Sequence, residues 1–453
     1  MASYMDDYFN DAKEDPEKNQ WGIVGAGIMH FDQTKRDLLE PQDWMQTLVM
    51  QDGESTKAKI IGSMIDFLPV DVAAIQKALD GDKIKIVSLT VTEGGYYLHD
   101  GKFDPGHPQI VQDIKTPDDP KTIFGIIVKS LKKYKESNGR TPFTVMSCDN
   151  IPHNGDIAKT VVVGLASATD PSLAEWIEEH VGFPNSMVDR ITPATTDEQR
   201  EFVMSTYGLE DASPVFCEPF RQWVLEDKFT AGRPNLDILD NVKFVDDVGP
   251  YEFMKIRVLN GGHASLCYPS GLLGLKYVHN AVEHATIGPF LDALERNEII
   301  PTVGPVPDMN LTEYWKTIGH RFANPTLNDT INRNCYDGAS RQPKFIVPVI
   351  ADNLEAGRKI DGFALVSAMW CRYCQGKTEA GEEIAPNDPK WDVLQPLAQM
   401  AATEPEKWLD GLSDVYGKTA QDPVFRKAFA SAIRTIEEIG VEAAMQKYID
   451  STN

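Results

Sequence analysis

The sequence predicts an α/β domain followed by a mainly helical domain. The first half alternates short, β-branched segments with segments of helical periodicity, which is typical of a mostly parallel sheet covered by helices. Beyond about Phe244, most apolar segments have helical periodicity. With 453 residues, 42% of them hydrophobic, the chain is long enough for two or three cored domains. We place these domains at residues 1–244 and 245–453, joined by residues 241–252.

Four segments of the first half are predicted strands because they are short, β-branched and often end in Gly or Asp. They are QTLVMQD (46–52), AKIIGSMIDFL (58–68), KIKIVSLTVTEGG (83–95) and TPFTVMSCDN (141–150). Between the last two lies PKTIFGIIVKSLKKYKESNG (120–139), a predicted helix that Gly139 can end. Ligands of such sheets bind beyond the carboxyl ends of the strands.

The second half is predicted to be helical. Its longest periodic segment, 251–285, contains Pro269 and Gly271, where we expect a kink or a break. The other predicted helices are IGPFLDALERNEI (287–299), LTEYWKTIGHRFAN (311–324), FALVSAMWCRYCQG (363–376) and DPVFRKAFASAIRTIEEIG (422–440).

The composition argues against several classes of partner. The formal net charge of −24, from 44 basic and 68 acidic residues, opposes non-specific binding to nucleic acid and anionic membranes. The sequence has neither a basic stripe nor an apolar run of about 18 residues. Its acidic first 20 residues lack the apolar core of a signal peptide. We therefore expect no nucleic-acid partner and no membrane partner.

Cysteine usage indicates a reducing compartment, and we expect the cytoplasm, because six cysteines in so long a chain do not suggest a disulfide scaffold. Cys371 and Cys374 could form half of a redox or metal site, but their segment predicts a buried helix, which we favour. No second C-x-x-C is present to complete a zinc site, and H-E-x-x-H is also absent. No metal is therefore expected.

The segment WGIVGAGIMHFD (21–32) predicts a strand that runs into a glycine turn. Gly25 and Gly27 match the start of the dinucleotide motif G-x-G-x-x-G, but His30 occupies its third position. A phosphate-binding loop and an ordinary turn are about equally compatible with this pattern. Asp32 could accept hydrogen bonds from a ribose, or it could be a loop acid or a helix cap.

Two further strands end in polar residues. Thr92, Glu93 and Gly94 end the first, and they could hold a cofactor or substrate or form a plain turn. Asn150 lies in SCDNIPHNG (147–155) at the end of the second. We favour a role for Asn150 as a donor to a substrate oxygen, with turn and cap chemistry as the alternative.

The segment MKIRVLNGGHASL (254–266) contains Lys255, Asn260 and His263 on a predicted helix. At about 100° per residue, these side chains fall within an arc of roughly 140°. Their apolar neighbours indicate burial, where a lysine must be paired, reach water or take part in chemistry. Spacing alone leaves a functional and a structural role open.

Five segments together resemble the mannitol dehydrogenase family, the polyol-specific long-chain dehydrogenases. They are LTVTEGGYY (89–97), FTVMSCDNIPHNG (143–155), FPNSMVDRITP (183–193), CEPFRQWVLEDKF (217–229) and MKIRVLNGGHASL (254–266). The resemblance extends from about Tyr4 to the C-terminus. It implies a Rossmann domain, a helical substrate domain, NAD as cofactor, no metal, and a monomer. The implied reaction is the interconversion of D-mannitol and D-fructose by hydride transfer.

The resemblance also implies roles for individual residues. Lys255 corresponds to the general base, and Asn150 and Asn260 to the groups that hold and polarise the reacting oxygen. His263 corresponds to a residue that binds and orients a substrate hydroxyl. Asp189 and Arg333 match polar positions of the substrate site.

Further implied roles concern proton transfer and the cofactor. Glu252 precedes Lys255 by one helical turn and could relay its proton to solvent, with a surface acid as the alternative. The residues expected to contact the cofactor are Gly25, Gly27 and Asp32 of WGIVGAGIMHFD and Thr92, Glu93 and Gly94 of LTVTEGGYY.

The resemblance further indicates that the family's first strand and its G-x-G-x-F-H-R-A-H-Q loop are absent from this sequence. SYMDDYFND (3–11) then corresponds to the helix that follows them, and WGIVGAGIMHFD to the second strand. Asp32 is thereby expected at the adenosine ribose, where a carboxylate favours NAD over NADP. We also expect weakened or absent NAD binding by the chain of 453 residues.

Alternative functions stay open at this level. Within the family, the chain could be a fructuronate or tagaturonate reductase or an arabinitol dehydrogenase. A uronate substrate favours an additional Arg or Lys, which residue spacing does not locate. From another class, the chain could be a degenerate sugar-binding homologue without cofactor turnover, although Lys255, Asn260 and His263 argue against long drift.

Overall fold

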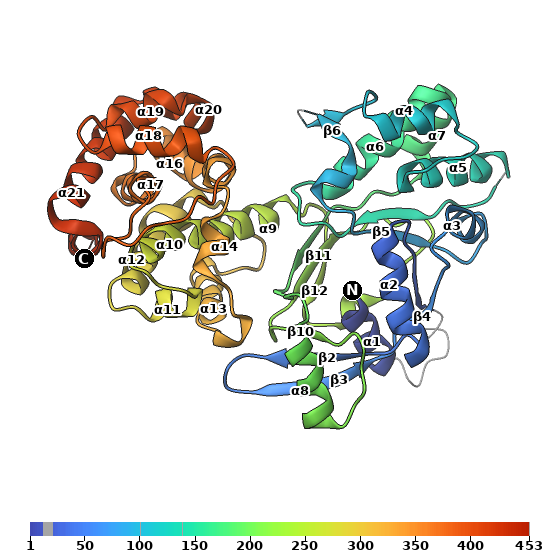
Figure 1. Cartoon of the computed structure of the whole chain (residues 1–453). Helices are drawn as coiled ribbons and strands as arrows, with labels where there is room; N and C mark the ends of the chain where they lie inside the picture. Colours follow the sequence, from blue (N-terminus) through green and yellow to red (C-terminus); the bar gives the residue numbers. More distant parts are fainter. Residues whose placement is uncertain (12–20, 100, 138, 453) are drawn as a thin grey trace. The chain divides into compact units, whose positions relative to one another are not determined.

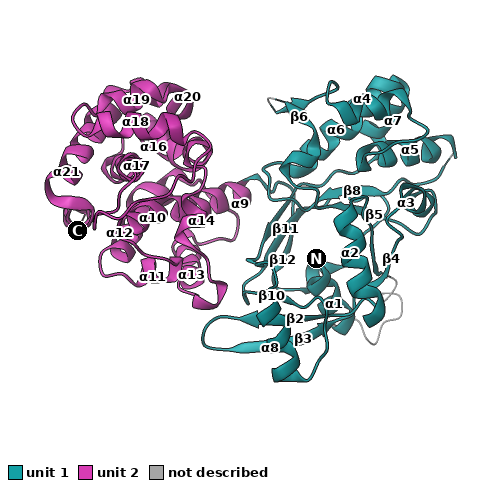
Figure 2. Ribbon diagram, in the orientation of Figure 1, with its two compact units in different colours: residues 1–249 teal, residues 250–453 magenta. Residues whose placement is uncertain are grey.

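The computed structural model describes residues 1–11, 21–99, 101–137 and 139–452 (Figure 1). The chain forms two compact units, unit 1 from Met1 to Gly249 and unit 2 from Pro250 to Asn453 (Figure 2). All strands of the described residues lie in unit 1, and unit 2 consists of helices and their connections. The predicted fold class is therefore confirmed.

Unit 1 contains several small sheets, in which four of the seven strand pairings are parallel. The parallel pairs are β1 (Ile23–Gly25) with β4 (Met64–Phe67), β5 (Ile86–Leu89) with β8 (Thr144–Ser147), β2 (Gln46–Gln51) with β10 (Val215–Cys217), and β11 (Gln222–Glu226) with β12 (Val242–Val245). The antiparallel pairs are β2 with β3 (Thr56–Ile61), β11 with β9 (Ser186–Asp189), and β6 (Leu98–His99) with β7 (Lys102–Phe103).

The predicted strand AKIIGSMIDFL forms two strands, β3 and β4. The strand is interrupted at Gly62 and Ser63, and the carbonyl of Ser63 accepts a hydrogen bond from the amide of Ile23 at 2.9 Å. β3 pairs antiparallel with β2, whereas β4 pairs parallel with β1, so the two strands lie in different sheets. Periodicity alone does not separate them because both halves of the segment are apolar.

Helices of unit 1 connect and cover these strands. They are α1 (Ala2–Asp11), α2 (His30–Leu39), α3 (Val72–Leu79), α4 (Pro108–Lys115), α5 (Ile123–Glu136), α6 (Asn154–Thr169), α7 (Pro171–His180) and α8 (Asp197–Tyr207). α5 confirms the helix expected at 120–139, and the side chain of Thr122 caps it by accepting from the amide of Gly125. The main core of the unit packs α5, α6 and α7 against β5 and β8.

Unit 2 is built from α-helices with inserted π-helical turns, η5 (Lys255–Asn260), η6 (Glu295–Ile299) and η9 (Gln342–Ile346). Its earlier α-helices are α9 (Gly249–Met254), α10 (Gly261–Leu272), α11 (Val278–Glu283), α12 (Ile287–Leu294), α13 (Leu311–Phe322), α14 (Ile331–Cys335) and α15 (Gly338–Arg341). Its later α-helices are α16 (Val347–Glu355), α17 (Asp361–Cys374), α18 (Trp391–Ala401), α19 (Glu406–Gly411), α20 (Ser413–Tyr416) and α21 (Pro423–Thr452).

Two helices at the centre of unit 2, α10 and α17, are buried along most of their length (Figure 1). α10 continues through Pro269 and ends at Leu272, and α11 begins only at Val278, so the predicted segment 251–285 breaks next to Gly271, as expected. Cys371 and Cys374 lie in α17 with 0% and 1% exposure, and burial raises the pKa of both thiols well above its ordinary value. The interpretation of WCRYC as part of a buried core helix is therefore confirmed.

Glu298 joins three helices of unit 2. Its carboxyl accepts hydrogen bonds from the amides of Gly362 at 2.7 Å and Phe363 at 2.9 Å, in the first turn of α17. It also accepts one from the hydroxyl of Tyr448 on α21, at 2.9 Å. Only 1% of Glu298 is exposed, and this burial raises its pKa to about 7, although the three hydrogen bonds act in the opposite direction.

Replacement of Glu298 tests this pKa through stability. Because the folded-state pKa lies above the ordinary value of 4.5, the contribution of Glu298 is complete at low pH and is lost as pH rises through about 7. A shift of this size corresponds to roughly 3 kcal/mol. We expect calorimetry to show a smaller loss of thermal stability for Glu298→Gln than for the wild type between about pH 5 and about pH 8. Equal losses in both proteins would contradict the assignment.

Candidate active site

In unit 1, predicted site residues lie beyond the carboxyl ends of the paired strands β5 and β8. The register places Leu89 opposite Ser147, so the turns that follow both strands leave the sheet at the same edge. Thr92, Glu93 and Gly94 form the exposed turn after β5, and Asn150 is exposed after β8. Together with Asp149, these residues form what we call the strand-end cluster.

Asp149 organises the strand-end cluster. Its Oδ2 accepts from the amide of Val91 at 3.0 Å, and its Oδ1 accepts from the amide of Thr92 at 2.9 Å. The hydroxyl of Tyr96 also donates to Oδ2, at 2.6 Å. These contacts hold Thr92 at a positive φ of 65°, a strained conformation for a β-branched residue that is found mainly at functional sites. Sequence reasoning missed Asp149, although it lies next to Asn150.

Asn154 explains other polar residues in SCDNIPHNG. Its Nδ2 donates to the carbonyls of Asp149 at 3.0 Å and Ser186 at 2.7 Å, and its Oδ1 accepts from the amide of Ser186 at 2.9 Å. The end of β8 is thereby attached to β9, whose last residue is Asp189 with 6% exposure. Part of this motif is therefore structural, because it attaches the end of β8 to the start of β9.

Close packing in the turn after β1 explains why positions 25 and 27 are glycines. A Cβ on Gly25 would lie 2.4 Å from the ring of Phe67, and one on Gly27 would lie 2.3 Å from the carboxyl of Asp32. Asp32 lies in the first turn of α2, where its Oδ2 accepts from the amide of Met29 at 2.8 Å. Asp32 is thus a helix cap at the carboxyl end of β1, and it provides this cap through Oδ2.

In unit 2, one continuous helical segment contains the predicted lysine, asparagine and histidine. We call it the lysine helix, residues 249–272, formed by α9, η5 and α10. Lys255 begins and Asn260 ends its π-helical turn, in which hydrogen bonds join residues five apart. The predicted α-helical arc therefore changes, because the π turn places these two residues one full turn apart. Such turns are frequent at functional sites.

Burial of the lysine helix affects each predicted residue differently. Lys255 is 6% exposed and Glu252 is 7% exposed, so Glu252 is not the surface acid of the alternative interpretation. His263 is 9% exposed, and its ring packs on Phe322 with 4.1 Å between the centroids. Burial lowers the pKa of His263 to about 4, so its imidazole is neutral near pH 7.

Asp329 connects His263 to Arg333. The carboxylate lies 3.6 Å from His263 Nε2 through Oδ2 and accepts from Arg333 Nη2 at 2.7 Å through Oδ1. The predicted residues His263 and Arg333 are therefore brought together by an acid that the sequence reasoning missed. The signal available was Asp329 itself, which lies four residues before Arg333 and is therefore one helical turn away.

Arg341 is another residue that sequence reasoning missed. Its charge lowers the pKa of His263, as do those of Arg333 and Arg321, so these cations lie within electrostatic reach of the imidazole. The buried Nε of Arg341 has no hydrogen-bond partner among the described residues. Such a donor favours a ligand that carries hydroxyl or carboxylate oxygens.

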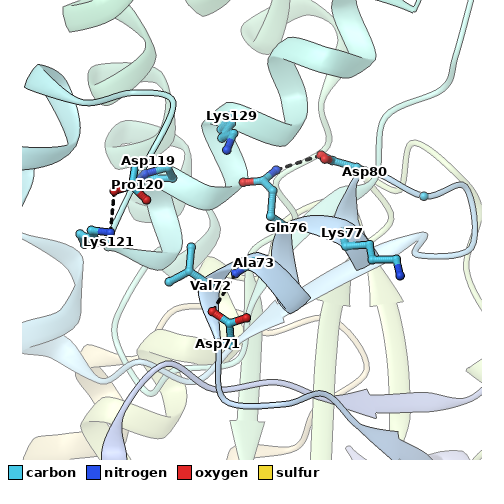
Figure 3. A pocket seen from close by; sticks show the side chains of 11 residues that line it. Asp71, Val72, Ala73, Gln76, Lys77, Asp80, Asp119, Pro120, Lys121 and Lys129 are labelled. Carbon is cyan, nitrogen blue, oxygen red and sulfur yellow. Dashed lines mark hydrogen bonds and ion pairs between the residues drawn. The ribbon is translucent and has the colours of Figure 1, made fainter.

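A surface hollow elsewhere in unit 1 is unrelated to these residues (Figure 3). It has a volume of about 610 Å³ and involves α3, α5 and the segment before α5. Its polar lining residues are Asp71, Gln76, Lys77, Asp80, Asp119, Lys121 and Lys129. Lys121 pairs with Asp119 at 2.8 Å, and Gln76 donates to Asp80 at 2.9 Å, so much of this polar lining is engaged internally. None of the predicted site residues lines the hollow.

Two further properties concern the described part of the chain. No cluster of three or more His, Cys, Asp or Glu residues suited to a metal ion occurs there. Every helix in the same residues is too short or too polar to span a lipid bilayer.

The chain belongs to the mannitol dehydrogenase family. Residues 2–238 match the Mannitol dehydrogenase Rossmann domain, and residues 247–437 match the Mannitol dehydrogenase C-terminal domain. The chain is 47% identical over 452 residues to a mannitol 2-dehydrogenase of Cereibacter sphaeroides, covering 99% of this chain and 93% of that protein. It is 37% identical to mannitol dehydrogenase 2 of Saccharomyces cerevisiae, covering 95% of this chain and 86% of the yeast protein.

Two solved structures are similar to the whole chain. The Pseudomonas fluorescens mannitol 2-dehydrogenase, in a ternary complex with NAD and D-mannitol, has a TM-score of 0.81 and 37% sequence identity. The match covers 99% of this chain and 91% of that one. A D-sorbitol dehydrogenase in substrate-free form has a TM-score of 0.88 and 33% identity, with 98% and 91% coverage.

The role of Asp149 can be tested through stability. Asp149→Ala removes the acceptor of two backbone amides and the Tyr96 hydroxyl in a buried region, which we expect to destabilise the protein by about 3 kcal/mol. Thermal unfolding measures this loss. The exposed acid Glu178 provides the control, because Glu178→Gln should change stability by less than about 0.5 kcal/mol. Equal melting temperatures for both variants would contradict the assigned role.

Proposed function

We propose that this chain is an NAD-dependent, metal-independent oxidoreductase that interconverts D-mannitol and D-fructose. The observation that carries the proposal is the lysine helix, in which buried Lys255 and half-buried Asn260 bound a π turn and neutral His263 follows. Oxidation of a secondary alcohol needs a base for the hydroxyl proton, and an amide donor and a neutral imidazole can hold the reacting oxygen and a neighbouring hydroxyl. The family membership and the mannitol 2-dehydrogenase relatives support the same reaction.

Residues of unit 1 suit a dinucleotide. Asp32 offers a half-buried carboxylate at the carboxyl end of β1, which fits the hydroxyls of a ribose. The exposed turn Thr92–Gly94 is held by Asp149. A bound cofactor could approach its backbone closely, because the position where Gly94 would carry a Cβ is open space. Gly25 and Gly27 keep the turn before Asp32 compact. NAD would supply the hydride acceptor that amino-acid side chains lack.

Lys255 acts as the general acid and base of the proposed reaction. During oxidation, its neutral amine accepts the proton of the reacting hydroxyl while the alcohol carbon loses a hydride. During reduction, the protonated Lys255 returns a proton to the O2 atom of fructose. Glu252, which is buried one helical turn earlier, receives the proton from Lys255 and passes it toward solvent.

Asn150 and Asn260 stabilise the reacting oxygen. This oxygen gains negative charge in the transition state of oxidation, so amide donors bind it more strongly there than in the ground state. His263, Asp189 and Arg333 bind hydroxyl groups away from the reacting carbon. Asp329 holds His263 and Arg333 in place for this task.

We further propose that the protein acts in the cytoplasm as a monomer and without nucleic acid. The net charge of −24 and the free cysteines support this proposal. D-sorbitol is a second candidate substrate, because the D-sorbitol dehydrogenase structure is similar to nearly the whole chain.

The reaction is tested by following NADH formation with D-mannitol, D-sorbitol, arabinitol and mannonate. We expect the highest kcat/KM with D-mannitol, and Lys255→Ala should lower kcat by about a thousandfold because the general base is lost. Lys359→Ala, which removes an exposed lysine of unit 2, is the control and should leave turnover unchanged. Full turnover by Lys255→Ala near neutral pH would exclude the proposed base, and a preference for mannonate would indicate a hexuronate reductase.

Asp32 determines the choice of cofactor in this proposal. Its carboxylate accepts from the 2′-hydroxyl of NAD and repels the 2′-phosphate of NADP. Asp32→Asn keeps an oxygen that can cap α2 but removes the charge, so we expect the ratio of NAD to NADP affinity to fall by about tenfold or more. Calorimetric titration with both cofactors measures this ratio. Asp37→Asn, farther along the same helix, should leave it unchanged.

A further inference from the structure

Glu295 is a buried acid whose carboxyl has no partner in the described structure. It is 0% exposed and begins the π turn η6, directly after α12. Neither carboxyl oxygen has a hydrogen-bond partner among the described residues, and no described cation forms an ion pair with it. A buried group of this kind is normally hydrogen-bonded or paired, so its presence calls for a physical explanation.

The carboxyl of Glu295 packs against the lysine helix. A Cβ on Gly262 would lie 2.9 Å from Glu295 Oε1 and 3.3 Å from the ring of Phe322. Glycine at this position therefore lets the carboxyl and the aromatic ring approach the helix backbone together. Gly262 directly precedes His263, whose ring packs on the same Phe322 ring with 4.1 Å between centroids.

A second contact attaches the helix of Glu295 to the helix of Phe322. Trp315 on α13 donates from Nε1 to Oδ1 of Asp292 at 2.9 Å, one turn before Glu295 on α12. Trp315 also packs edge-on against Phe322, with 6.4 Å between the ring centroids. The Glu295 carboxyl thus lies in a space bounded by Gly262 and Phe322. Trp315 connects α12, which precedes Glu295, to the helix that carries Phe322.

The form of Glu295 that fits this space is the neutral acid. Burial raises the pKa of Glu295 well above its ordinary value, and the nearby charge of Asp292 raises it further. Other charged or titratable groups on neighbouring elements include Arg296 and Glu298 on η6, His263, Cys267 and Tyr268 on α10, Lys255 and Arg257 on η5, Glu313, Tyr314, Lys316, His320 and Arg321 on α13, and Asp352 and Glu355 on α16. None of these groups offsets the effect of burial on Glu295.

We propose that Glu295 is a positioning residue that fills the space between Gly262 and Phe322 and thereby holds the ring of His263. The effect of Glu295 on substrate binding rests on the proposed function, in which His263 binds a polyol hydroxyl. Ionisation of Glu295 as pH rises places an unpaired charge in this space, so the side chain or its neighbours must move. The His263 ring and the affinity for polyol then change together.

The test compares Glu295→Ala, Glu295→Gln and the matched control Glu298→Gln. Glu298 lies one turn later and is equally buried, but it faces α17 and α21 rather than the lysine helix. We expect Glu295→Ala to raise the KM for D-mannitol about tenfold while kcat changes less than about threefold. Glu295→Gln, which is neutral and of similar length, should restore the KM, and Glu298→Gln should leave it unchanged.

A spectroscopic measurement separates this proposal from the proposed function. The NMR signal of the His263 ring should shift in Glu295→Ala and return in Glu295→Gln, because the ring current of Phe322 acts on it. The same signal should move as pH rises in the wild type but not in Glu295→Gln. If no variant oxidises D-mannitol, the proposed function fails and this signal still decides the role of Glu295.

Specific results would overturn the proposal. One such result is that Glu295→Ala has the same KM and the same His263 signal as the wild type. The other is that Glu295→Gln fails to restore the KM or the His263 signal. If Glu295→Ala does not fold, the wild type and Glu295→Gln are compared across pH. Identical pH profiles of KM and of the His263 signal in these two proteins would then overturn it.

Discussion

A buried carboxylate must be matched by donors, and this requirement organises the functional regions of both units. In unit 1, Asp149 uses two backbone amides and a tyrosine hydroxyl to connect the turns that follow β5 and β8. In unit 2, the half-buried Asp329 connects His263 to Arg333 in a similar way. Glu298 applies the same principle to three helices. The acids that hold elements together are therefore different from the residues proposed to touch substrate.

Glu295 differs from these acids because no described residue donates a hydrogen bond to its carboxyl, and burial raises its pKa well above the ordinary value. The lysine helix lies so close to this carboxyl that a Cβ on Gly262 would be 2.9 Å from Glu295 Oε1. A helix that presents a base, an amide and an imidazole needs its backbone held firmly, because small displacements of reacting groups strongly reduce rates. Glu295 packs against the helix beside His263, and Asp329 lies close to the His263 imidazole. Both contacts help to hold His263 in place.

Much of the candidate site could be predicted from the sequence, but not the contacts that position it. Asn150, Lys255 and His263 could be selected because polar side chains at strand ends or on apolar helices are unusual. Asp149 and Asp329 were missed because an acid beside a motif has the same appearance as a surface acid until its partners are known. The π turn was also beyond sequence reasoning, since a single turn with hydrogen bonds between residues five apart has no residue pattern that distinguishes it from an α-helical turn.

The sequence by itself determined the order of elements, the α/β and helical halves, and the family, because these depend on local periodicity and on motifs that are continuous in the chain. Tertiary structure alone decided that AKIIGSMIDFL divides between two sheets and that α10 continues through Pro269. It alone also decided which acids are paired and which is neutral. The physical reason is that strand pairing, burial and the pKa of an acid depend on residues distant in sequence.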